Sequence, residues 1–155
     1  MDEKIIEVRH IGNQNEPRFE IWLREITIDK PLNGISTVIS ENFRKVAVAV
    51  NVTEPSKWPV PVKKETNLQK SINWLFEDYN LYQSELNSQR AKHIKQSLYD
   101  WGENVFFQIF SNKEILAFYA MLQKERKGCI HIISAYADIL SWPWEAVFSF
   151  DTSPI

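Results

Sequence analysis

Cys129 and His131 form the only cysteine–histidine pair that is close in the sequence, and such a pair could supply a nucleophile and its base. The apolar residues around them predict a β-strand, in which positions two apart face the same side with Cβ atoms about 7 Å apart. That separation does not directly give the hydrogen bond that a nucleophile and its base need, and a zinc site needs more ligands. We therefore favour a structural role, with Cys129 buried and His131 hydrogen-bonded within the strand.

The other titratable side chains do not form a catalytic arrangement in the sequence. His10 is expected at the end of a strand and His93 on a helix, and neither has an evident carboxylate partner. Solvated helix faces explain the clustered acidic residues better than a metal site or a glycosidase pair does: Glu77, Asp78, Asp100 and Glu103. The sequence thus predicts no catalytic residue, no metal ligand and no cofactor.

Glycine content and charge argue against two further classes of protein. The four glycines are spread along the chain, whereas a phosphate-binding loop needs several together. The net charge is −2, and the one local group of positive residues, Lys57 with Lys63 and Lys64, fits a solvated loop. We therefore expect neither nucleic acid nor an acidic membrane surface as a partner.

Composition indicates a folded protein of a reducing compartment. Of the 155 residues, 44% are apolar and 25% are charged, which is ordinary for a globular domain. The single cysteine cannot form an internal disulfide, and the first residues lack the apolar run of a secretory signal. No stretch approaches the roughly 20 apolar residues of a membrane-spanning helix. We expect a cytoplasmic protein.

The first half of the chain is predicted to be rich in β-strands, at residues 5–9, 18–28, 35–39 and 45–52. Phe19, Ile21 and Leu23 alternate with polar positions, as in a strand with one buried face. The sequence Pro-Leu-Asn-Gly at 31–34 has the residues of a turn. The segment 45–52 is apolar at successive positions, so we expect it to be a central or covered strand.

The second half is predicted to be helical and then to return to a strand. Residues 54–65 contain three prolines and form a connector, which we interpret as a rigid linker rather than a proline-rich recognition motif. Capping sequences begin at Thr66 and Ser111. Helical apolar spacing predicts one helix through 68–86, ended at Asn87 and Ser88, and a second at 91–109. A third, shorter helix is predicted from the capping sequence at 111–114 through Ile115, Phe118 and Leu122 to a basic last turn at 124–127. Gly128 then precedes a wholly apolar strand at 129–135, which we expect to be buried on both faces.

These elements predict a mixed α/β fold, with a β-rich segment (1–53), a connector (54–65) and a helical part ending in a strand (66–155). The tail contains Pro143, Trp144 and Glu145 directly after that strand. A solvated loop does not normally contain two tryptophans beside a proline. The sequence therefore assigns these three residues to an architectural corner.

The order of helices, buried strand and Pro-Trp-Glu corner resembles the opening segment of a CHAT domain, a caspase-like cysteine peptidase. The resemblance covers residues 68–148 and is carried by three motifs: WGENVFFQIF at 101–110, IHIIS at 130–134 and PWEAV at 143–147. It implies that 129–135 is the first strand of a caspase-like sheet. Trp142, Ala146 and Val147 stand where the family usually has leucine.

The resemblance implies a cysteine endopeptidase acting on proteins, often in bacterial defence or regulated cell death. The family's catalytic histidine and cysteine lie after later strands, so neither Cys129 nor His131 matches them, and the chain alone is expected to be inactive. The expected partner is a protein: the rest of the peptidase, a sensor module or a second copy. Two alternatives remain, a complete non-enzymatic protein-interaction module and an independent enzyme whose nucleophile cannot be named.

Overall fold

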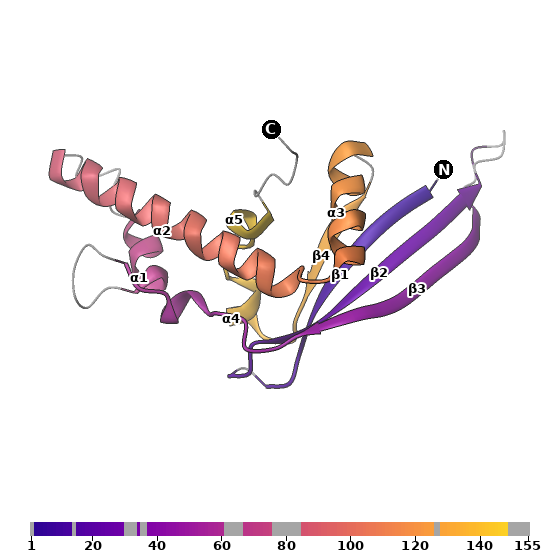
Figure 1. Cartoon of the computed structure of the whole chain (residues 1–155), viewed down its shortest axis with the longest axis horizontal. Coiled ribbons are helices and arrows are strands. Elements are labelled where there is room, and N and C mark those ends of the chain that lie inside the picture. The colour runs from indigo at the N-terminus through magenta and orange to yellow at the C-terminus, as the bar shows by residue number, and fades with distance from the viewer. Residues whose placement is uncertain are drawn as a thin grey trace. The chain divides into compact units, whose positions relative to one another are not determined.

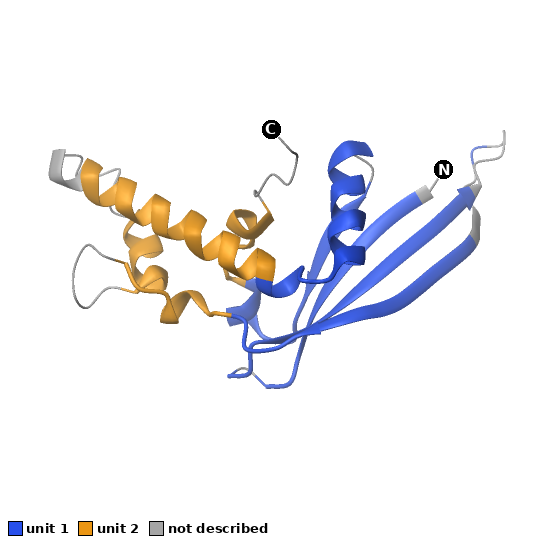
Figure 2. Cartoon of the chain, in the orientation of Figure 1, with its two compact units in different colours: residues 1–52, 108–140, 152–155 blue, residues 53–107, 141–151 orange. Residues whose placement is uncertain are grey.

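The computed structural model describes residues 2–13, 15–29, 34, 37–60, 67–75, 85–125 and 128–148. The protein has the mixed α/β fold that the sequence predicts. Its residues group into two compact units, coloured separately in Figure 2. Unit 1 comprises residues 1–52, 108–140 and 152–155, and unit 2 comprises residues 53–107 and 141–151.

Unit 1 contains a mixed sheet, which among the described residues has four strands in the order β3-β2-β1-β4 (Figure 1). The strands are β1 (Asp2–Ile11), β2 (Arg18–Asp29), β3 (Thr37–Ala49) and β4 (Cys129–Ile133). The pairs β1–β2 and β2–β3 are antiparallel, whereas β1 and β4 are parallel. This parallel pair brings residues 108–140 into the unit of the β-rich segment, so the compact units differ from the segments 1–53 and 66–155.

Strand β3 differs from the two strands predicted at 35–39 and 45–52, because it runs without a break from Thr37 to Ala49. Residues 35 and 36 lie outside the described part. Two register shifts against β2 accommodate this length. The expected central position is wrong, since β3 is at a sheet edge and Val48 is 45% exposed. Valine favours strands at edges as well as in the interior, so its abundance does not report burial.

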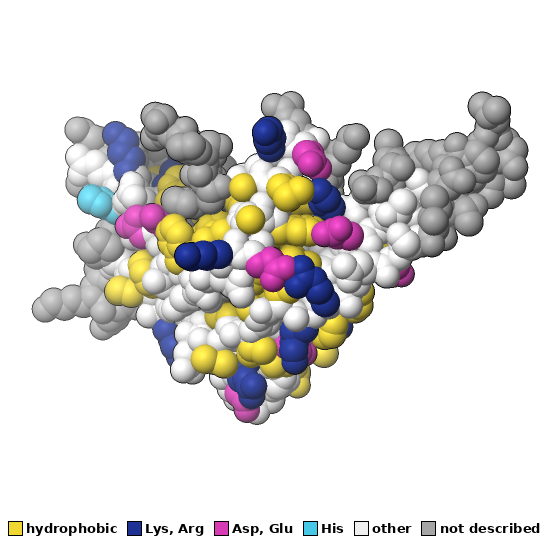
Figure 3. Space-filling model, turned by 45° about the vertical axis from the view of Figure 1, so that its right-hand side comes forward, with side chains coloured by type: hydrophobic (Ala, Val, Ile, Leu, Met, Phe, Trp, Pro, Cys, Tyr) yellow, Lys and Arg dark blue, Asp and Glu magenta, His cyan; other side chains and the backbone are white. Residues whose placement is uncertain are grey.

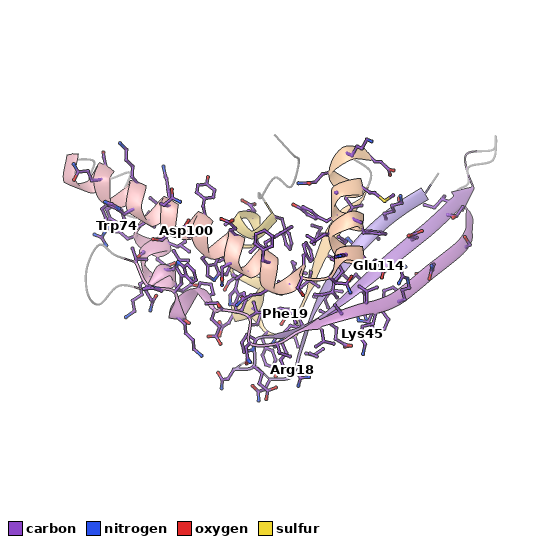
Figure 4. The ribbon with its side chains drawn as sticks, viewed as in Figure 1. Arg18, Phe19, Lys45, Trp74, Asp100 and Glu114 are labelled. Atoms are coloured by element: carbon purple, nitrogen blue, oxygen red, sulfur yellow. The ribbon has the colours of Figure 1, made fainter. Side chains whose placement is uncertain are left out.

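One face of the sheet carries the core of unit 1. Alternate residues of β1 and β2 on this face are buried, as the period of two predicts: Ile6, Val8, Phe19, Ile21 and Leu23. Helix α3 (Lys113–Glu125) packs with this face and buries its own apolar stripe of Ile115, Phe118 and Leu122. An ion pair between Arg44 of β3 and Glu114 in the first turn of α3 joins helix and sheet. Glu114 is labelled in Figure 4.

Strand β4 is at the opposite edge from β3, and the expectation that it is buried on both faces is wrong. Cys129, His131 and Ile133 are exposed on one side, and Ile130 and Ile132 are half-buried on the other. The apolar sequence of the strand could not show that it has one neighbour rather than two. Gly128 has φ +137, and a Cβ there would lie 2.3 Å from the carbonyl oxygen of Lys4, so only glycine fits this approach to β1.

Helix α1 (Leu68–Asn73) and all but the last two residues of α2 (Glu85–Ile109) belong to unit 2. The predicted buried stripe of α2 is confirmed at Ala91, Ile94, Trp101 and Val105. The break expected at 87–88 is wrong, because α2 continues through both residues. Thr66 and the predicted stripe at 79–86 fall at positions where side chains are not described.

Three shorter elements complete the description, and two helix caps can be compared with the sequence. They are the 3-10 helix η1 (Pro55–Lys57) and α5 (Trp144–Phe148) in unit 2, and α4 (Ala137–Leu140) in unit 1. Asn67 caps α1 by accepting a hydrogen bond from the backbone N–H of Lys70 at 3.0 Å. Asn112 likewise accepts one from Glu114 at the start of α3. Asparagine therefore takes the capping position next to each predicted one.

Candidate functional site

Cys129 and His131 lie closer together than the sequence argument allowed. The Sγ atom of Cys129 is 3.2 Å from Nε2 of His131, and both side chains are exposed. The separation of about 7 Å holds for Cβ atoms on a strand, whereas the thiol and the imidazole extend beyond them and can turn toward each other. The expectation of a buried cysteine out of reach of its histidine is therefore wrong.

Proximity alone does not make Cys129 an activated nucleophile. Partial desolvation of the thiol, and then the negative charge of Glu3, raise the pKa of Cys129 above its ordinary value. A catalytic cysteine needs the reverse, because the thiolate attacks and positive surroundings stabilise it. The pair can share a hydrogen bond, but its surroundings hold the thiol in the protonated form at neutral pH.

The outer side of β4, called here the β4 edge, has no hydrogen-bonded strand among the described residues. Its five residues, Cys129–Ile133, contain no Lys, Arg, Asp, Glu or Pro. The edge at β3 is different, because it carries Glu41, Arg44 and Lys45 and two register shifts. Charges and irregularities are the usual protection against edge-to-edge pairing. As far as the described residues show, charges and register shifts protect the β3 edge and not the β4 edge.

The sheet face that carries Cys129 and His131 also carries a charged aromatic cluster on β1, β2 and β3. Trp22 stacks on Phe43 with ring centroids 4.7 Å apart, and the guanidinium of Arg9 lies 4.8 Å from both centroids. The Nε1 atom of Trp22 is buried and has no hydrogen-bond partner among the described residues. Sequence reasoning missed this cluster, because its members come from three strands and can be placed together only when the register of those strands is known.

Ion pairs neutralise the arginines of this cluster. Glu7 is 5% exposed and its carboxylate lies 2.7 Å from Arg9 and 3.9 Å from Arg24. Arg24 also pairs with Glu41 of β3. Two carboxylates therefore balance two guanidinium groups, which leaves no excess positive charge for an anionic ligand. The arrangement suits cross-strand stabilisation better than catalysis.

His10 lies in a chain of hydrogen bonds at the carboxyl ends of β1 and β4. Its Nε2 is 2.7 Å from the carbonyl oxygen of Glu16, so Nε2 carries the proton and donates. Ser134 Oγ is 3.4 Å from Nδ1 of His10. The same oxygen accepts a hydrogen bond from the backbone N–H of Tyr136 at 3.0 Å. The sequence could not indicate this contact, because His10 and Ser134 are 124 residues apart.

The Ser134–His10 contact does not form a hydrolytic site. The hydroxyl oxygen of Ser134 already accepts a backbone hydrogen bond, and the imidazole is oriented by a carbonyl rather than by a carboxylate. His10 also packs edge-on against Phe19 and Tyr136, with centroids 5.5 and 5.7 Å away. These contacts fasten the loop after β4 to the end of β1.

The corner residues Pro143, Trp144 and Glu145 begin helix α5. Trp144 is 9% exposed and stacks on Trp142 with centroids 5.4 Å apart. Trp142 in turn meets the edge of Trp101, whose Nε1 donates to the carbonyl oxygen of Thr53 at 2.8 Å. Glu145 is exposed. The aromatic rings of the corner thus belong to the core of unit 2.

The remaining candidates are dispersed, and several are outside the described residues. His93 and Glu103 are exposed on α2. On the same helix Asp100, which is labelled in Figure 4, accepts a hydrogen bond from Gln96 at 2.9 Å. The Nζ atom of Lys57 lies 3.9 Å from Oε1 of Glu54. The structure does not describe four of the candidates: Glu77, Asp78, Lys63 and Lys64.

Two properties of the described residues concern metal binding and membrane crossing. Within the described ranges, no group of three or more His, Cys, Asp or Glu side chains is placed to hold a metal ion. No helix in the described part is both long and apolar enough to cross a membrane. On the surface drawn in Figure 3, positive and negative side chains are interspersed with hydrophobic ones.

Comparisons of the chain with protein-family models, with curated proteins and with solved structures found no significant match.

Proposed function

We propose that this chain is the N-terminal, non-catalytic part of a CHAT-type cysteine endopeptidase, to which it contributes one strand of the peptidase sheet. The observation that supports the proposal is the setting of β4. The strand follows helix α3, pairs in parallel with β1, and precedes the Pro-Trp-Glu corner at α5. A strand between helices with a parallel neighbour is the arrangement of an α/β sheet.

The unprotected β4 edge gives this proposal a physical basis. Among the described residues, β4 pairs with β1 alone, so its outer side is available to a further strand. A further strand beside β4 would satisfy the backbone groups of its outer side and cover part of its exposed side chains. In the proposed peptidase this strand comes from the segment that follows the corner.

The chemistry of the described residues supports a non-catalytic role for this part. The pKa of Cys129 is raised, and the His10–Ser134 pair is held by backbone groups. A CHAT-type peptidase would therefore carry its nucleophile and base elsewhere. The family resemblance suggests protein substrates and a role in bacterial defence or regulated cell death.

A complete, non-enzymatic protein-interaction module is a second candidate, and one observation favours it. Strand β1 from the first half of the chain pairs with β4 through five registered positions, from Ile5 with Cys129 to Arg9 with Ile133. The sheet is therefore built partly from segments of the same chain. In this case the β4 edge would be the surface that receives a partner.

Intact mass and active-site labelling of the natural protein separate the two candidates. We would isolate it with an antibody against this chain and treat it with a peptidyl electrophile that alkylates catalytic cysteines. A mass well above 18.3 kDa and labelling at a cysteine other than Cys129 would support the peptidase. A natural protein of about 18.3 kDa that is not labelled would contradict the peptidase proposal and favour the interaction module. Pre-treatment with iodoacetamide provides the control for specific labelling.

A further inference from the structure

We infer that the β4 edge pairs with the β4 edge of a second copy of the chain, forming an antiparallel homodimer with one sheet across a two-fold axis. The inference concerns the same edge as the proposed function and applies to this chain by itself, because in the proposed peptidase a later strand would fill the edge instead. It needs no peptidase activity and is tested separately. The proposed occupant of the edge is a second copy of the chain. While the dimer persists, the edge is closed to any other strand.

The difference between the two edges supports a contact at β4 rather than at β3. Strand β4 contains no Lys, Arg, Asp or Glu, so pairing two copies of it brings no side chains of these types together. Strand β3 carries Glu41, Arg44 and Lys45, whose charges would have to be desolvated or matched in an edge contact.

Symmetry determines which side chains would meet. A two-fold axis perpendicular to the sheet makes the two copies of β4 antiparallel and keeps each face on its own side. The exposed residues Cys129, His131 and Ile133 would then lie opposite the same set in the second copy. Because opposite side chains in antiparallel strands are about 5 Å apart, their exposed apolar surface would be shared between the copies.

The length of β4 limits the affinity. Five residues form a small contact compared with a stable protein interface, for which roughly 1,600 Å² is typical. We therefore expect a reversible dimer with a dissociation constant in the micromolar range or weaker. This corresponds to a free energy of association on the order of −8 kcal/mol or less favourable. Such a dimer could give way to a strand that pairs more extensively with the same edge.

The sheet itself provides a matched pair of positions for the test. Ile133, Arg9, Glu20 and Val48 form one cross-strand row, so Ile133 and Val48 lie at its two ends on the same face. Their exposed fractions are 43% and 45%. Lysine at either position adds the same charge to an edge strand, but only Ile133→Lys places it on β4.

Sedimentation velocity across a dilution series from about 1 μM to about 1 mM tests the inference, since this range brackets the expected affinity. We expect dimers for the natural sequence and for Val48→Lys, and at least ten-fold weaker association for Ile133→Lys. Monomers of the natural sequence over the whole range would overturn the inference. Equal weakening by both variants, or none by Ile133→Lys, would also overturn it.

Hydrogen exchange of the natural sequence provides a measurement that does not depend on a variant folding. The backbone amides of residues 130–132 include groups directed to the outer side of β4, away from β1. We expect their protection to rise with protein concentration, whereas amides of β3 should be unaffected. Protection in β4 that does not change with concentration would contradict the dimer, whatever the behaviour of Ile133→Lys.

Discussion

Gly102 of α2 and Ala146 of α5 lie so close together that a Cβ added to Gly102 would be 2.4 Å from the carbonyl oxygen of Ala146. Real Cβ atoms do not approach an oxygen that closely, so an alanine here must displace the α5 backbone. The absence of a side chain at Gly102 thus lets the helix that begins with the Pro-Trp-Glu corner pack against α2.

Replacing Gly102 by alanine is expected to destabilise the protein although alanine favours helices by about 1 kcal/mol. Overpacking typically costs roughly 1–3 kcal/mol, so the net effect should be a lower unfolding midpoint in urea. Lys95→Ala, at an exposed position of the same helix, is the control and should change the midpoint little. A midpoint raised by Gly102→Ala would show that the close approach does not exist in solution.

Trp144→Ala is expected to be one of the more damaging single changes in unit 2. The indole is 9% exposed and stacks between Trp142 and Phe148. Removing a buried tryptophan typically costs about 3–5 kcal/mol. Denaturant unfolding followed by circular dichroism measures the loss, with Tyr99→Ala (59% exposed) as the control. An unchanged midpoint would place the Trp144 ring on the surface.

The purified chain is expected to hydrolyse no peptide, because the raised pKa of Cys129 disfavours its thiolate and the carbonyl oxygen of Glu16, rather than a carboxylate, orients His10 beside Ser134. A broad peptide library followed by mass spectrometry provides the measurement. Turnover that disappears in Cys129→Ala or His131→Ala would contradict the expectation. Turnover that survives both variants would indicate contamination or another nucleophile.

The alkylation rate of Cys129 should report its raised pKa. Partial desolvation and the charge of Glu3 both disfavour the thiolate, so reaction with iodoacetamide should be slow at pH 7 and accelerate at alkaline pH. Glu3→Gln removes one cause, which should lower the pKa and speed alkylation at a given pH. Glu103→Gln, in unit 2, should leave the rate unchanged. A fast reaction at pH 7 would mean that His131 activates the thiol.

The ion pair between β3 and α3 should produce a small pH dependence of stability. The hydrogen bond from Arg44 lowers the pKa of Glu114 in the folded protein. Its stabilising contribution is therefore present above the ordinary pKa of a glutamate and is lost as the pH falls through the lowered pKa. The melting-temperature difference between the natural sequence and Glu114→Gln should be small at pH 7 and should decrease as the pH falls below the ordinary pKa of a glutamate. A difference that grows at low pH would reverse the sign and refute the assignment.

Local periodicity was sufficient to predict much of the secondary structure. The apolar stripe of α2 was visible because a helix repeats every 3.6 residues, and Ala91, Ile94 and Trp101 are buried as this spacing requires. The alternation at Phe19, Ile21 and Leu23 likewise identified the buried face of β2. These signals depend on neighbours in the sequence, so one chain is enough to read them.

Long-range pairing and side-chain reach account for what was missed. An apolar strand such as β4 has the same composition in the middle of a sheet as at its edge, so its exposure at Cys129 could not be read from the sequence. The contact of Cys129 with His131 was dismissed on Cβ spacing, although the distance between side-chain ends decides it. The His10–Ser134 contact needed the pairing of β1 with β4, which no local pattern encodes.

The parallel pairing of β1 with β4 also has a consequence for how the protein folds during synthesis. The antiparallel strands β1, β2 and β3 are consecutive and can form as soon as the first third of the chain has left the ribosome. Strand β4 is made only after α1, α2 and α3, so the side of β1 that will receive it stays open while these helices are translated. Because distant contacts form slowly and exposed strand edges invite misassembly, docking of β4 should be the late, vulnerable step of folding.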